Sequence, residues 1–128
     1  TVDSISPKFS IAVPALISSL IYNESVFSSI QSVIMDLPAE NFPIYKKAAA
    51  KKGLKAEVNR ANFKNIAILI FEKAIEGLGS EEEDWLIPFF ENYTKEGLTP
   101  AEENLEIFEG SGDDPNIWIK TILDMENY

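Results

Sequence analysis

The sequence predicts an all-α protein, a single-domain irregular bundle of six to seven short helices around a buried central helix. Ala, Glu, Ile, Leu and Lys are abundant while Thr and Val are scarce, and this composition favours helices over strands. Apolar residues recur at spacings of three and four along most of the chain, which is the helical period. With 128 residues, the chain is long enough to bury a core without disulfides.

The most apolar stretch of the chain, residues 66–71, predicts the central helix. Its sequence is Ile-Ala-Ile-Leu-Ile-Phe, and a helix without a polar face is normally enclosed by other helices. A buried strand is the alternative, but no Gly or Pro brackets the stretch and helical spacing continues on both sides. We therefore predict a helix over about residues 55–78, in which Ile70 and Phe71 are almost fully buried.

The N-terminal part of the chain predicts two helices. We expect residues 1–128 to form one domain, because no low-complexity linker divides the chain. Residues 1–8 have no periodicity and are expected to form an extended leader. Apolar rows predict a first helix over 14–22, and Asn23 is a good N-cap for a second helix that ends before Pro38. The first apolar stretch is too short to span a membrane, so we expect no membrane span.

The later helices are bounded by recognisable start and stop residues. Pro43 lies in the first turn of a third helix, which Gly53 ends. Ser80 opens a capping box for a helix that runs to about residue 96, and Thr99 opens another for a short sixth helix. These positions give the chain its order of helices without any strand.

Two acidic runs, residues 81–84 and 109–114, raise the question of a cation site. Carboxylates are favoured at helix N-termini by the helix dipole, and the second run lacks the alternating oxygen ligands of a calcium loop. We therefore predict that both runs are helix starts, the second leading into a last helix from about Pro115. No metal ion and no cofactor is expected.

The chain contains no Cys and no His. This removes thiol nucleophiles, zinc sites built on sulfur or imidazole, and the side chain most often used as a general base near neutral pH. The serines have no histidine partner, so we expect a protein that is not an enzyme. A net charge of −10 also argues against nucleic acid as a partner, because phosphate neutralisation drives such binding.

The content of charged residues differs most from the chain average of 25% in residues 9–35. These 27 positions contain one charged side chain, Glu24. Exposed helix faces normally carry charge for solubility, whereas interface cores are depleted in charge. We therefore predict a protein-interaction or structural module that self-associates through this helical hairpin, most simply as a two-fold homodimer. The predicted interface residues are small or uncharged: Ser18, Ser25, Ser29 and Gln31.

An alternative function is an extracellular carrier for a fatty acid or a similar apolar molecule. Aromatic residues are concentrated in the last third of the chain, and a cavity between them and the central helix would suit such a ligand. The competing interpretation is that these side chains form the core. The residues expected to line the cavity are Phe71, Trp85, Phe89, Phe90, Tyr93, Phe108 and Trp118.

Basic and acidic residues are segregated along the chain. Seven of the eleven basic residues lie between Lys46 and Lys64, whereas residues 81–128 carry two basic and fourteen acidic side chains. Pairing of the basic segment with the acidic last third is the simpler explanation. The alternative is a docking patch for an anion, formed by Lys46, Lys47, Lys51 and Lys52.

Two glycosylation sequons start at Asn23 and Asn92. They favour a secreted protein, although a cytoplasmic location is not excluded. The compartment is not fixed by the missing cysteines, because a chain of this size can fold without disulfides.

Overall fold

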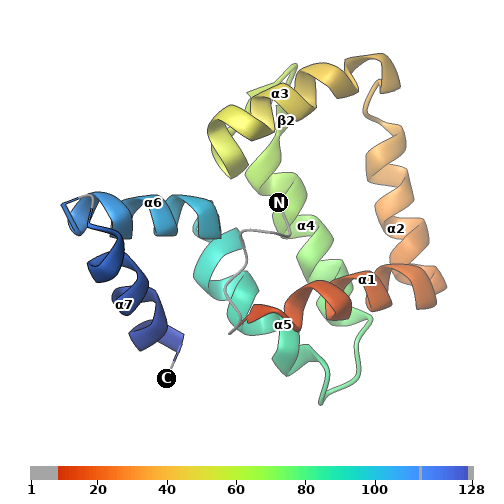
Figure 1. Cartoon of the computed structure of the whole chain (residues 1–128). Helices are drawn as coiled ribbons and strands as arrows, with labels where there is room; N and C mark the ends of the chain where they lie inside the picture. The colour runs from red at the N-terminus through yellow and green to blue at the C-terminus, as the bar shows by residue number, and fades with distance from the viewer. Residues whose placement is uncertain (1–8, 113, 127–128) are drawn as a thin grey trace.

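The computed structural model describes residues 9–112 and 114–126, and it confirms the all-α fold (Figure 1). Seven α-helices are found in these residues: α1 (Ala12–Tyr22), α2 (Glu24–Met35), α3 (Phe42–Lys52), α4 (Phe63–Glu76), α5 (Glu83–Phe89), α6 (Pro100–Gly110) and α7 (Pro115–Glu126). The short elements are two 3₁₀ turns (Ala39–Asn41 and Gly53–Lys55), a π-helical segment (Phe90–Thr94) and the strands β1 (Glu57–Val58) and β2 (Ala61–Asn62). The leader predicted over residues 1–8 lies outside the described residues.

The predicted start of the central helix near residue 55 is wrong. The chain leaves α3 through the 3₁₀ turn Gly53–Lys55 and then forms the antiparallel hairpin of β1 and β2. The two residues of the hairpin turn, Asn59 and Arg60, have φ angles of 49° and 71°, and a tight two-residue hairpin turn requires positive φ at both positions. Turn geometry therefore prevails over helical spacing, and α4 begins only at Phe63.

The C-terminal half of α4 is joined to the α1–α2 hairpin by side-chain hydrogen bonds. The Ser19 hydroxyl donates to the Ala74 carbonyl (2.7 Å), and the Asn23 amide nitrogen donates to the Gly77 carbonyl (3.2 Å). The Asn23 side-chain oxygen accepts the Val26 N–H (3.1 Å), so Asn23 caps α2 as predicted. We call this meeting point of α1, α2 and α4 the junction. It fixes the angle between the hairpin and α4.

The core lies beside the junction, where α1, α4 and α5 meet. Ala12, Ala74 and Leu86 are each at most 2% exposed and form its centre. Partly buried hydrophobic side chains pack around them: Leu16, Leu20, Phe71, Ile75, Leu78 and Phe89. This core covers only one end of α4.

Ile70 and Phe71 are only half-buried: Ile70 lies on the open side of α4, and Phe71 lies at the margin of the core, stacked on Phe89 and Phe90. The prediction that they are almost fully buried is wrong because α3 packs against the 3₁₀ turn and the hairpin that follow it. These short elements lie between α3 and the start of α4, and α3 reaches α4 through Tyr45, whose ring meets Phe63. Helix α4 is therefore central in the fold without being enclosed along its whole length.

The predicted helix from Ser80 to about residue 96 is confirmed except at its start. Helix α5 begins at Glu83, and the Glu82 carboxylate accepts the Gly79 N–H (2.8 Å) in place of the predicted capping box. Pro88 lies inside α5, and its missing N–H removes one helical hydrogen bond. The π-helical segment follows directly.

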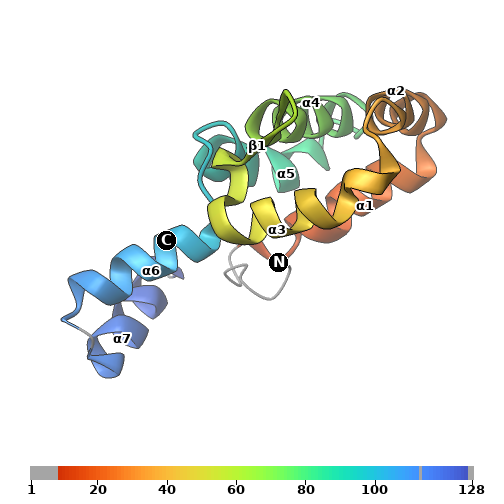
Figure 2. The same ribbon diagram turned by 90° about the horizontal axis from the view of Figure 1, so that it is seen from above.

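Helices α6 and α7 form a two-helix arm, residues 100–126, that projects from the body formed by residues 9–99 (Figure 2). Thr99 starts α6 with the predicted capping box: its hydroxyl accepts the Glu102 N–H (3.2 Å), and its own N–H donates to the Glu102 carboxylate (2.8 Å). Within the arm, the Phe108 and Trp118 rings pack edge to face with centroids 5.7 Å apart.

Replacing Gly77 by Ala is expected to destabilise the junction. An added Cβ would lie 2.3 Å from Val26 Cγ2 and 3.0 Å from the Ser19 hydroxyl oxygen, so packed side chains must shift. We expect a loss of about 1–3 kcal/mol in the free energy of unfolding, measured by urea denaturation. Gly110→Ala is the control, because no atom lies within 4 Å of its added Cβ and the position is helical. Equal stability of the two variants would contradict the packing of the junction.

Candidate functional site

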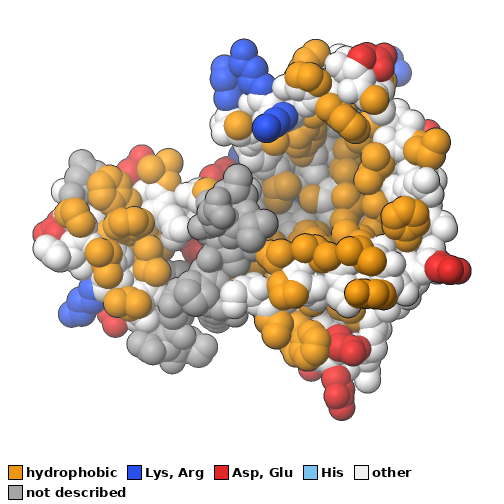
Figure 3. Space-filling view, turned by 45° about the vertical axis from the view of Figure 1, so that its right-hand side comes forward, with side chains coloured by type: hydrophobic (Ala, Val, Ile, Leu, Met, Phe, Trp, Pro, Cys, Tyr) orange, Lys and Arg blue, Asp and Glu red, His pale blue; other side chains and the backbone are white. Residues whose placement is uncertain are grey.

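The open side of α4 forms a wholly apolar hollow of about 330 Å³. We call it the apolar basin, and its lining residues are Leu37, Phe42, Tyr45, Leu54, Ala61, Phe63, Ile66, Ala67 and Ile70. Figure 3 shows hydrophobic side chains gathered around this hollow over α1, α2 and α3. Its apolar lining suits an apolar partner.

The floor of the basin is one face of α4. Phe63, Ile66, Ala67 and Ile70 are spaced by three and four residues, which places them along one side of the helix. Tyr45 of α3 is buried against this side, with its ring edge to face on Phe63 at 6.2 Å. We predicted from the sequence that this face of α4 is buried in the core. The prediction goes too far because periodicity identifies an apolar face but not what covers it.

Helices α1 and α2 expose many large hydrophobic side chains outside the basin. Seven large hydrophobic side chains of residues 9–35 are exposed: Ile11, Ile17, Ile21, Tyr22, Phe27, Ile34 and Met35. On α2, Phe27, Gln31, Ile34 and Met35 follow one another at spacings of four, three and one, which places them on one side of the helix. We call these seven side chains the apolar border. Apart from Glu24, the segment is uncharged at its surface, but its exposed side chains are large and hydrophobic, unlike the mainly small residues predicted for the interface.

The structure does not bring the four predicted interface residues onto one surface. Ser18 lines a groove of about 410 Å³ together with Trp85 and two side chains of the apolar border, Ile11 and Tyr22. Ser25 and Ser29 lie beside α4, and the Ser29 hydroxyl donates to the Ser25 carbonyl (2.8 Å). Gln31 is exposed among the hydrophobic side chains of α2. Of the four, Ser18 and Gln31 therefore lie beside side chains of the apolar border, on two different helices.

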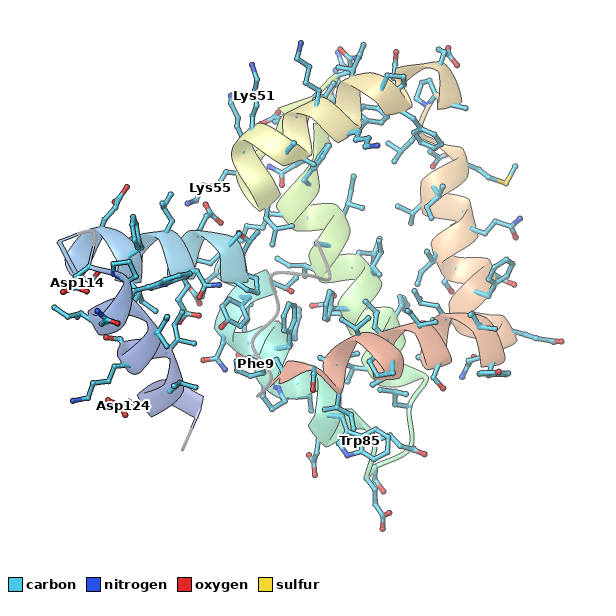
Figure 4. The ribbon with its side chains drawn as sticks, in the orientation of Figure 1. Phe9, Lys51, Lys55, Trp85, Asp114 and Asp124 are labelled. Carbon is cyan, nitrogen blue, oxygen red and sulfur yellow. The ribbon has the colours of Figure 1, made fainter. Side chains whose placement is uncertain are left out.

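The seven aromatic residues predicted to line a ligand cavity are also divided. Phe71, Phe89, Phe90 and Tyr93 pack on one another, with Phe71 stacked on Phe89 at 5.7 Å and on Phe90 at 6.0 Å. Trp85 is 46% exposed and lies at the outer surface, away from the basin (Figure 4). Phe108 and Trp118 pair inside the arm. The described residues thus contain no single cavity walled by all seven.

The basic segment forms one edge of the body near the arm, where Lys51 and Lys55 project (Figure 4). Lys55 makes an ion pair of 2.7 Å with Glu102 of α6, which joins the basic segment to the acidic last third as predicted. The four lysines of the predicted anion patch are exposed on α3, and in the described part of the chain none of them makes an ion pair: Lys46, Lys47, Lys51 and Lys52.

Two side chains at the root of the arm have shifted pKa values. The Tyr93 hydroxyl donates to the Glu103 carboxylate, and burial together with this hydrogen bond raises the pKa of Tyr93. For Glu102, burial opposes the charged form, but hydrogen bonds from Lys55 and Thr99 outweigh it and hold the pKa of Glu102 below its ordinary value. Both interactions connect α6 to the body and serve to position the arm.

The two sequons differ in accessibility. The Asn23 side chain is half-buried in the junction, and its amide nitrogen is already a donor to Gly77. Asn92 is exposed, and its amide nitrogen donates to the Pro88 carbonyl at 2.6 Å. Of the two, Asn92 is the one that the fold leaves open to modification.

Among the described residues, no group of three or more Asp and Glu side chains has the arrangement of a metal site. None of the helices in this part of the chain combines the length and apolar character needed to cross a membrane. No protein-family model, no curated protein and no solved structure matches the chain. Function is therefore inferred from the basin, the apolar border and the arm.

Glu102→Gln is expected to lower stability at neutral pH but not in acid. A carboxylate whose pKa is depressed on folding stabilises the protein above its unfolded pKa, and this contribution is lost as the pH falls through the folded pKa. The loss at neutral pH should be below about 1 kcal/mol, because Lys55 is largely exposed. Chemical denaturation at neutral and acidic pH measures it. Glu106→Gln, an exposed position on the same helix, is the control, and a difference that persists in acid would contradict this role of Glu102.

Proposed function

We propose that this protein is a non-enzymatic interaction module that self-associates through the apolar basin and the apolar border. The observation that carries the proposal is the apolar border itself: residues 9–35 expose seven large hydrophobic side chains and contain one charged residue, Glu24. Contiguous apolar patches larger than a few hundred Å² are rare on monomeric proteins and usually mark a binding surface.

The energetics favour covering this surface. Removing apolar surface from water contributes about 25 cal/mol for each Å² that is buried. The cores of protein interfaces are depleted in charge, and the apolar border and the basin have that composition. A second protein surface can therefore cover both without leaving a charge buried and unpaired.

The shape of the basin supports protein binding more than the alternative, carriage of a fatty acid. Small-molecule sites enclose most of their ligand and supply a few polar groups that orient it. The nine lining residues of the basin offer a single polar side-chain group, the Tyr45 hydroxyl, and the hollow is open on one side. A fatty acid would find a place for its chain there but little to hold its carboxylate. An apolar protein face needs no such group.

Placing a carboxylate on the floor of the basin tests the proposal. Ala67→Glu puts a charge where the partner surface would pack, whereas Asn65→Glu puts the same charge on an exposed position of the same helix. We expect the native chain and Asn65→Glu to form dimers in sedimentation velocity, and Ala67→Glu to sediment as a folded monomer. Circular dichroism confirms that both variants remain helical.

Two results would overturn the proposal. The first is a native chain that remains monomeric at concentrations of about 100 μM, well above the Kd of ordinary specific interfaces. The second is an Ala67→Glu variant that dimerises as the native chain does. If the native monomer binds dodecanoate and Ala67→Glu loses that binding, the carrier function replaces the interaction module.

A further inference from the structure

The arm carries apolar side chains that its own chain leaves exposed. Ile119 and Leu123 are 50% and 55% exposed, and they lie one turn apart on the same side of α7. The opposite side of α7 packs on α6 through Trp118, whose ring meets Phe108. The arm is thus a two-helix unit with an apolar contact inside it and an apolar strip outside it.

The arm is held away from the body by specific contacts at its root. Lys55 pairs with Glu102 at 2.7 Å, and the Tyr93 hydroxyl donates to Glu103. The capping box at Thr99 fixes the first turn of α6. Figure 2 shows the arm extending from the body, so the strip on α7 does not fold back over its own basin.

The basin and hydrophobic side chains of the arm are visible on the same side of the molecule in Figure 3. Two copies placed face to face about a two-fold axis would therefore set each arm against the basin of the other copy. Such a contact is isologous and closes after two chains, because each copy gives one arm and receives one.

We infer that the arm of a second copy occupies the apolar basin, with Ile119 and Leu123 against the floor formed by α4. This inference rests on the proposed self-association and names the segment that performs it. The reciprocal exchange covers the basin and the apolar strip of α7 in both copies with one kind of contact.

The distribution of charge favours this arrangement of the two chains. Two chains of net charge −10 repel each other, so a stable dimer must bring unlike charges together where they meet. Residues 100–126 contain eight acidic side chains and one basic side chain, Lys120. Helix α3, which gives Phe42 and Tyr45 to the basin, carries four exposed lysines that make no ion pair in the described residues. Two of them, Lys51 and Lys52, line a groove that faces α6 of the same chain. An acidic arm docked on the basin would lie near Lys46 and Lys47 of this helix.

Mixing two defective variants tests the exchange. Ile119→Glu damages the arm and Ala67→Glu damages the basin. A dimer of either variant with itself would therefore have no intact contact between an arm and a basin. An equimolar mixture contains one intact contact, between the arm of the Ala67→Glu chain and the basin of the Ile119→Glu chain. We expect each variant to be monomeric in sedimentation velocity, with a Kd raised at least about tenfold, and the mixture to regain dimers.

Ile117→Glu is the matched control for the arm. Ile117 is 51% exposed on the same helix but lies about 200° around it from Ile119, so this variant should dimerise as the native chain does. Because the chain has no cysteine, Ala67→Cys and Ile119→Cys chains can also be joined by a flexible bismaleimide. The mixed pair should crosslink faster than Ala67→Cys with Ile117→Cys, and this readout does not depend on the stability of a charged variant.

The outcomes separate this inference from the proposed function. If Ala67→Glu abolishes dimers but Ile119→Glu does not, the module still associates through its basin and the arm is not the occupant. A mixture that stays monomeric while the native chain dimerises would also overturn the exchange. A native chain that is monomeric overturns both.

Discussion

The junction at the end of α4 determines the rest of the structure. Asn23 caps α2 with its side-chain oxygen and reaches the last turn of α4 with its amide nitrogen, while Ser19 bonds a carbonyl inside the same helix. Gly77 is the residue that permits this approach, because any larger side chain would collide with Val26. Side-chain hydrogen bonds therefore join three helices at one end of α4.

The basin is a consequence of that one-ended attachment. Helix α2 leaves the junction and carries the chain away from α4, and α3 returns to it only through a 3₁₀ turn and a two-stranded hairpin. The four helices α1 to α4 then outline a frame (Figure 1), and the apolar basin lies where α3 and its connections meet α4. The arm points outward from the body and does not cover this hollow.

Local signals in the sequence predicted local structure well. The Asn23 cap, the Thr99 capping box and the start of the last helix at Pro115 are all found, because each depends on hydrogen bonds within a few residues. The hairpin at Asn59 and Arg60 was missed, since these residues fit helical spacing and only their positive φ angles reveal the turn. Apolar residues at helical spacing also continue into α4, so the sequence shows no interruption at the hairpin.

The candidate site could be predicted only in outline. Apolar periodicity indicates that Ile66 and Ile70 belong on a covered face, but it does not say whether the same chain covers them. The lack of charge in residues 9–35 pointed to an exposed apolar surface, whereas the serines chosen from it lie on different sides of two helices. Which side chains share a surface depends on the crossing of α1, α2 and α4, and that crossing is set by the junction.

The uneven distribution of charge has a colloidal consequence. Tyr22 is the one titratable side chain of the apolar border, so the apolar attraction between copies is almost independent of pH. The negative charge that makes copies repel each other lies mainly in the acidic last third. As the pH approaches the isoelectric point near 4.4, those carboxylates are neutralised and the long-range repulsion disappears. We therefore expect mild acid to precipitate the protein, because the repulsion between copies is then lost while the exposed apolar side chains remain.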